Sequence, residues 1–152
     1  MRNQFLAWGL LVLMLGVLVG ESEAGVPPDA EMAMRSLQSQ APQARFMLTG
    51  SRFTRVYGQP LSFGSSAQES AEQFRLDHAA VFEVATDDLQ PQPFAEGGAL
   101  GQPVMYQPER SSYKFTLFRY DQHKDGVPVF RSQLKLLVLN EANFPLVMAA
   151  SS

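Results

Sequence analysis

The strongest structural constraint in this chain is a β-hairpin signal near its C-terminus. Asp125-Gly126 is typical of tight hairpin turns, because glycine accepts the positive φ that such turns require. Residues 113–122 alternate between two sets of side chains before this turn, and residues 127–140 form a largely apolar run after it. Pro128 lacks an N–H for the strand ladder, so it belongs at the start of its strand or on an edge. The pattern predicts two antiparallel strands hinged at Gly126.

Further strands are predicted on either side of this hairpin. Residues 140–143 indicate a second turn, and residues 144–152 indicate a third strand that returns alongside. Upstream, β-branched and aromatic residues at 46–57 predict an edge strand or a hairpin. Residues 86–112 hold four of the chain's ten prolines and three glycines, which predicts a long loop that is either mobile or in contact with a partner.

The clearest helix signal begins at Ser66. Glu69 follows three residues later, which is the spacing of a capping box, in which each side chain binds a free backbone N–H of the first turn. One face is apolar and the other polar; the apolar face consists of Ala67, Ala71, Phe74, His78, Val81 and Phe82, and the polar face of Glu69, Glu72, Arg75 and Asp77. Such a helix requires a sheet to cover its apolar face. The expected fold class is therefore α+β, with one amphipathic helix packed on a small antiparallel β-sheet.

The N-terminal segment is typical of a signal peptide. After Arg2, residues 5–19 form a run of 15 residues without a charge, which is short of the about 20 apolar residues of a membrane span. Ser22 and Ala24 occupy the small-residue positions that signal peptidase reads. The sequence thus predicts a signal peptide at residues 1–24, with an uncleaved anchor as the alternative. The protein is expected to be secreted, extracellular or periplasmic, and to meet the membrane only transiently through the signal peptide.

The segment after the predicted cleavage site is expected to be a linker. Residues 25–45 are polar and bracketed by prolines, and Met32, Met34 and Leu37 give only a weak helix pattern. The expected organisation is a signal peptide at 1–24, a linker or arm at 25–45 and one folded domain at 46–152.

Composition excludes several classes of function. The net charge is −3, from 12 basic and 15 acidic residues without a basic stripe, so nucleic acid is not an expected partner. The chain has no cysteine, and therefore neither a disulfide framework nor a cysteine nucleophile. It has two histidines but no H-E-x-x-H zinc motif, no serine nucleophile elbow and no EF-hand loop. No catalytic, cofactor-binding or metal-binding residue is predicted, and the chain is not expected to be an enzyme.

His78 is the titratable residue that most needs an interpretation, because it lies on the apolar helix face between Phe74 and Phe82. With no second histidine close in sequence, a half-buried structural role is the expectation. A small hydrolase is a third hypothesis for the chain. It requires His78 to lie in an open cleft beside an acid, and burial of His78 against the two phenylalanines would argue against it.

The helix sequence "AEQFRLDHAAVFEV" and the sheet sequence "YKFTLFRYDQHKDGVPVFRSQLKLLVLN" resemble the fungalysin/thermolysin propeptide (FTP) domain, the N-terminal part of the pro-region of secreted zinc metallopeptidases. The residues on the family's sheet motif are Tyr120, Gln122, Gly126, Val127, Pro128, Val129 and Phe130. The resemblance covers about residues 46–150. Two features depart from it: residues 91–108 look like an insertion, and Glu83 stands where glycine is usual.

The resemblance implies a non-catalytic pro-domain, an intramolecular chaperone and inhibitor of a thermolysin- or fungalysin-like zinc metallopeptidase. The expected partner is the peptidase catalytic domain, in cis or in trans, and the chain is expected to be a fragment of a longer precursor. The seven motif residues are candidates for the partner interface, through the hairpin around Gly126 and an exposed strand edge. The alternative is that Gly126 and Pro128 only shape the hairpin. A free-standing secreted binding or adhesion module of the same fold is the second hypothesis for function.

Overall fold

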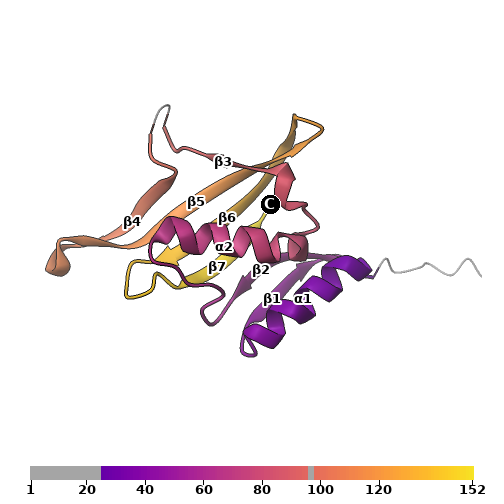
Figure 1. Ribbon diagram of the computed structural model, residues 1–152, viewed down its shortest axis with the longest axis horizontal. Coiled ribbons are helices and arrows are strands. Elements are labelled where there is room, and N and C mark those ends of the chain that lie inside the picture. Colours follow the sequence, from indigo (N-terminus) through magenta and orange to yellow (C-terminus); the bar gives the residue numbers. More distant parts are fainter. Residues whose placement is uncertain (1–24, 96–97) are drawn as a thin grey trace, which may run out of the picture.

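The computed structural model of the chain describes residues 25–95 and 98–152, so the predicted signal peptide lies outside the described residues. Helices and an antiparallel sheet make up this part of the chain (Figure 1). In chain order the elements are α1 (Pro28–Gln40), β1 (Arg45–Thr49), β2 (Arg52–Tyr57), α2 (Ala67–His78), η1 (Ala79–Phe82), η2 (Thr86–Asp88), β3 (Leu89–Gln92), β4 (Gly101–Gln107), η3 (Pro108–Arg110), β5 (Ser112–Lys124), β6 (Val127–Leu139) and β7 (Leu146–Ser151). None of the helices in the described part is long and apolar enough to cross a membrane.

The described strands form one seven-stranded sheet in the order β1-β2-β7-β6-β5-β3, with β4 also paired to β5, and every pairing is antiparallel. The predicted hairpin is confirmed as β5 and β6, each 13 residues long. Both residues of its turn, Asp125 and Gly126, have positive φ, as a tight hairpin turn requires. The third strand, β7, and the hairpin of β1 and β2 are confirmed as well.

The helix α2 begins as its sequence predicts. The hydroxyl of Ser66 accepts a hydrogen bond of 3.1 Å from the backbone N–H of Glu69. The carboxylate of Glu69 reaches back to the backbone N–H of Ser65, at 2.7 Å, which is one residue before the expected partner. The α-helix ends at His78, and the short 3₁₀ helix η1 then carries Val81 and Phe82 into the core.

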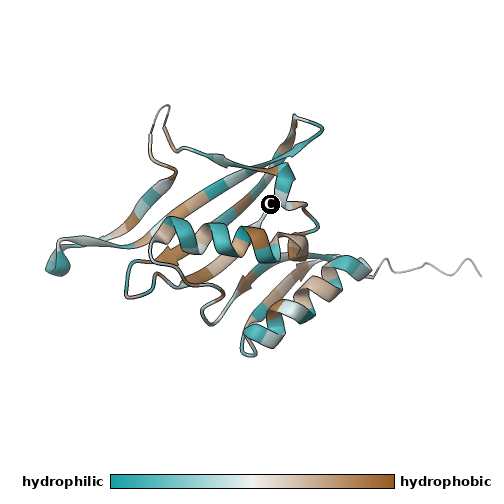
Figure 2. Cartoon of the chain, viewed as in Figure 1, coloured by the Kyte–Doolittle hydropathy of each residue, from teal (hydrophilic) through white to brown (hydrophobic). Residues whose placement is uncertain are grey.

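A single hydrophobic core lies between the helices and one face of the sheet. Alternate residues of the central strands point into it, among them Val56 of β2, Leu136 of β6 and Ala149 of β7. Phe74 and His78 of α2 cover them, and both are buried. Figure 2 shows hydrophobic and hydrophilic residues alternating along β5 and β6, as expected for a sheet with one covered face.

The prediction of a linker at residues 25–45 and of a single helix is wrong. Residues 28–40 form helix α1, in which Ala30 and Leu37 are buried in the common core. A proline at the start and two acidic residues, Asp29 and Glu31, in the first turn favour a helix N-terminus here. The apolar side of α1 is narrow and built largely of small residues, so its periodicity is weak in the sequence.

The prediction that residues 86–112 form a long loop is wrong, because part of this segment is strand. Two strands lie within this segment, and both pair with the same edge of β5. Pro91 in β3 and Pro103 in β4 are tolerated because these are edge strands, where a missing N–H breaks no ladder on the outer side. Gly101 is required at the start of β4, since a Cβ atom there would lie 2.6 Å from the Cγ2 of Thr116.

Candidate binding surface

The seven motif residues divide between the core and the surface. Tyr120 is only 1% exposed and lies beneath α2, so it does not belong to a surface that a partner can reach. At the far end of the hairpin the opposite holds: Val127 is 65%, Val129 38% and Phe130 83% exposed. We call the end of the hairpin from residue 123 to residue 133 the hairpin surface. It brings Gly126 and Pro128 together with these three apolar side chains.

An irregularity in β6 produces the exposure of Phe130. His123 pairs with Pro128 and Asp121 pairs with Gln133, so residues 129–132 of β6 stand opposite Gln122 alone. Arg131 adopts a positive φ of 57°, an uncommon conformation for a residue with a side chain, and its guanidinium lies 5.0 Å from the centre of the Phe130 ring. The backbone therefore bulges and presents Phe130 to solvent.

The hairpin surface also has an unpaired strand edge. The pairing of β7 with β6 ends at Leu134, followed by two backbone hydrogen bonds between Ser152 and Gln133. Residues 127–132 therefore have no strand beside them on that edge within the described part of the chain. However, Pro128 lacks a donor and Arg131 interrupts the extended backbone, and both features oppose the addition of a strand. Side-chain contacts suit this surface better than strand addition.

Tyr120 has a structural role that the sequence did not indicate. Its hydroxyl donates a hydrogen bond of 2.9 Å to the carboxylate of Glu72, which also forms an ion pair of 2.9 Å with Arg75. Arg75 in turn donates to the carbonyl of Thr86 at 2.8 Å. Burial first of all, and then the neighbouring Glu72 carboxylate, raise the pKa of Tyr120 well above its ordinary value. These contacts of Tyr120, Glu72 and Arg75 join α2 to β5 and to the segment that follows η1.

His78 is a buried structural residue. It is 3% exposed, and its ring lies 5.3 Å from that of Phe74. Burial lowers its pKa, against the opposing effect of the Asp77 carboxylate. The open cleft that the hydrolase hypothesis needs is therefore not present at His78. Among residues 25–95 and 98–152, no group of three or more His, Asp or Glu side chains is arranged to hold a metal ion.

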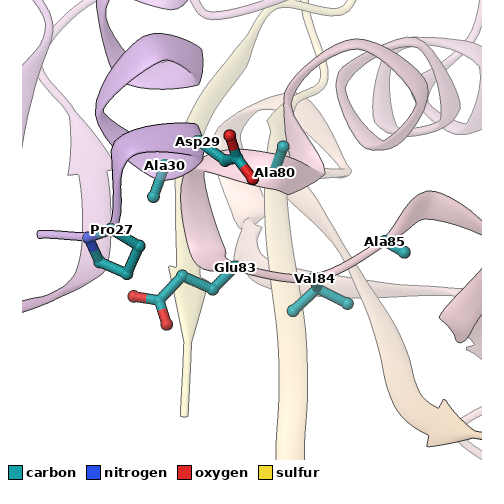
Figure 3. A pocket seen from close by; sticks show the side chains of 7 residues that line it. All are labelled: Pro27, Asp29, Ala30, Ala80, Glu83, Val84 and Ala85. Carbon is teal, nitrogen blue, oxygen red and sulfur yellow. The ribbon is translucent and has the colours of Figure 1, made fainter.

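A cavity of about 330 Å³ lies between the N-terminal end of α1 and the residues around η1. Figure 3 shows its lining, which consists of Pro27, Asp29, Ala30, Ala80, Glu83, Val84 and Ala85. Its two carboxylates have structural explanations: Asp29 lies in the first turn of α1, where a negative charge is favourable, and Glu83 pairs with Arg52 at 3.4 Å. It lies apart from the motif residues.

The described chain is thus a mixed domain of helices and an antiparallel sheet, and its candidate site is the hairpin surface with its three exposed apolar side chains. Comparison with protein-family models, curated proteins and solved structures finds no match for this chain.

Proposed function

We propose that this chain is an exported, non-catalytic pro-domain that binds, folds and inhibits the catalytic domain of a thermolysin- or fungalysin-like zinc metallopeptidase, in cis or in trans. The observation that supports this most is that Val127, Val129 and Phe130, three motif residues of the FTP resemblance, are exposed together on the hairpin surface. The proposal includes processing of the exported chain after Ala24.

The exposed side chains are a source of binding free energy. Burying a large apolar side chain such as Phe130 contributes about 1.5–3 kcal/mol, and aromatic residues in the middle of an interface often dominate its affinity. The bulge sets the backbone position of Phe130 before binding, so less backbone entropy is lost when the partner is bound. Such a surface needs complementary shape in the partner and no reactive side chain of its own.

An inhibition and refolding assay with matched variants tests the proposal. The purified chain is added to zinc peptidases secreted by the same organism, both as active enzymes and during their refolding from denaturant. Phe130→Ala is expected to weaken inhibition about tenfold, as for a hot-spot residue. The control is Leu76→Ala, which removes an apolar side chain that is 56% exposed on α2. The proposal is contradicted if the chain changes neither the activity nor the refolding of the peptidases. It is also contradicted if Phe130→Ala and Leu76→Ala weaken inhibition equally.

A second candidate, a free-standing secreted binding or adhesion module, is favoured by a different observation. The hairpin of β4 and β5 carries exposed Met105, Tyr106 and Tyr113, with the two tyrosine rings 5.2 Å apart. Met105 and Tyr106 lie within residues 91–108, the segment that departs from the FTP resemblance. Asn140 holds the base of this hairpin, donating to the carbonyl of Tyr113 at 2.9 Å. This candidate predicts a partner other than a peptidase, whose binding is lost in Tyr113→Ala and kept in Phe130→Ala.

A further inference from the structure

The face of the sheet turned away from the helices has a chemical pattern of its own. Because directly paired residues of neighbouring strands point to the same face, the pairing defines rows of side chains across the sheet. The row that faces the core consists of Phe46, Val56, Ala149, Leu136 and Phe118. The rows on either side of it point to the other face of the sheet, which we call the open face. The apolar row of this face contains Tyr57, Met148, Leu137 and Leu117. The basic row contains Arg55, Ala150, Lys135 and Arg119.

The open face remains accessible. Both described α-helices pack on the core row, since Leu37 of α1 and Phe74 of α2 belong to the same core as Val56 and Leu136. The side chains of the two rows on the open face are partly exposed, with Arg55 the most exposed of them. The loop after β3 touches one end of this face, where the guanidinium of Arg119 lies 4.0 Å from the centre of the Phe94 ring and donates to the carbonyl of Pro93 at 3.4 Å.

Charge is segregated on this face. The whole chain carries a net charge of −3, yet the open face holds Arg45, Arg55, Lys135 and Arg119 beside a single carboxylate, that of Asp121. None of these four bases takes part in an ion pair among residues 25–95 and 98–152. Asp121 accepts a hydrogen bond of 2.8 Å from the side chain of Gln133. Arg55, Lys135 and Arg119 therefore form a basic row that runs parallel to the apolar row, and Arg45, paired with Tyr57, stands at the end of the apolar row on β1.

We propose that the open face binds an amphipathic helix of a partner protein, with an apolar stripe flanked by acidic side chains. The apolar row spans β2, β7, β6 and β5, and with neighbouring strands about 4.8 Å apart this is roughly 14 Å, the length of about ten helical residues. The basic row lies two residues further along each strand, at about 7 Å. That offset is within the diameter of about 10 Å that a helix has with its side chains, so acidic residues beside the apolar stripe can reach the basic row. The attraction between the acidic side chains of the helix and the basic row sets the orientation of the bound helix more than it adds affinity.

The chemistry of the open face favours a protein over a membrane or a nucleic acid. Insertion into a bilayer interface needs protruding apolar side chains, and those of the apolar row are recessed, since none is among the large exposed hydrophobic residues. Single-stranded nucleic acids need successive aromatic side chains on which bases stack, and Tyr57 is the one aromatic residue of these two rows. Aliphatic Leu117, Leu137 and Met148 instead suit leucine-like side chains of a helix.

The test is independent of any peptidase and uses the purified chain expressed from its complete sequence. The probe is a synthetic helical peptide of about 14 residues, with leucine at i, i+3, i+4 and i+7 and glutamate at the flanking positions. A peptide with lysine in place of glutamate is the matched control. Binding is followed by peptide fluorescence anisotropy, and the binding site is mapped by amide chemical shifts of the isotopically labelled chain. Arg55→Glu with Lys135→Glu tests the basic row, and Arg35→Glu on α1 is the control charge reversal.

The expected result is binding of the glutamate peptide alone, with shifts along β2, β7, β6 and β5. The double reversal is expected to weaken this binding by about tenfold or more while Arg35→Glu leaves it unchanged. The proposal is overturned by absence of binding at millimolar peptide, by equal binding of the lysine peptide, or by shifts confined to the helices or the hairpin surface. Tighter binding to anionic lipid vesicles or to an oligonucleotide would also overturn it, in favour of those partners.

Discussion

At the scale of single residues, the hydrogen bond between Tyr120 and Glu72 is the contact that joins α2 most specifically to the sheet. We expect Tyr120→Phe to lower the free energy of unfolding by about 1–3 kcal/mol, because the partly buried carboxylate of Glu72 loses a donor. Urea unfolding measures this change. Tyr113→Phe, at a residue that is 45% exposed, is the control and is expected to change little. A Tyr120→Phe variant as stable as the parent would show that the hydroxyl is dispensable.

His78 makes the stability of the fold depend on pH. Burial lowers its pKa in the folded chain below the ordinary value of 6.5, so at mildly acidic pH the unfolded chain binds a proton that the folded chain does not. Its contribution is therefore favourable above pH 6.5 and is lost as the pH falls below that value, by at most about 1.4 kcal/mol per pH unit.

The effect of His78 is measured as the free energy of unfolding between about pH 7.5 and about pH 5, because a histidine titrates in roughly this range. His78→Gln is expected to flatten the dependence in this range, whatever its effect on overall stability. An unchanged slope in His78→Gln would mean that other groups cause the acid sensitivity.

At the scale of elements, α1 is an integral part of the fold and not an arm. Leu37 is fully buried, so Leu37→Ala is expected to cost about 2–5 kcal/mol through the lost apolar contacts and the cavity left behind. Met32 lies on the same helix but is 68% exposed, and Met32→Ala is expected to change stability by less than about 0.5 kcal/mol. Thermal or urea unfolding of the two variants compares them directly. Equal small effects would mean that α1 is only loosely attached.

The elements that the sequence predicts well are those with strong local signals. Asp125-Gly126 defines the hairpin of β5 and β6, and Ser66 with Glu69 defines the start of α2. The strands β3 and β4 depend on pairing with β5, which is distant in sequence, and Pro91 and Pro103 hide them because prolines are rare in strands. Helix α1 depends on its burial against the core, which its weak periodicity does not reveal.

The candidate site was predictable in its position but not in its geometry. The motif pointed to the hairpin, yet nothing in the sequence separates buried Tyr120 from exposed Phe130. That separation arises from the irregular pairing between Asp121 and His123 and from the positive φ of Arg131. The open face could not be predicted either, because its basic row joins residues of four strands that come together only through the order of the sheet.

At the scale of the whole molecule, the fold offers surfaces of different character. The hairpin surface has three exposed apolar side chains among charged ones, whereas the open face combines a recessed apolar row with a basic one. The two surfaces adjoin on β6, where Gln133 of the hairpin surface is two residues from Lys135 of the basic row, so each is tested by its own variants. We propose a protein partner for each of the two surfaces.

The most direct test of the proposed function is amide hydrogen exchange of the chain with and without a thermolysin-like catalytic domain secreted by the same organism. We predict slower exchange at residues 123–133, the hairpin surface, when the catalytic domain is present. The Phe130→Ala variant is expected to need about tenfold more catalytic domain for the same protection. Unchanged exchange at saturating catalytic domain, or protection elsewhere with the hairpin surface unaffected, would contradict the account of this chain as a pro-domain acting through its hairpin.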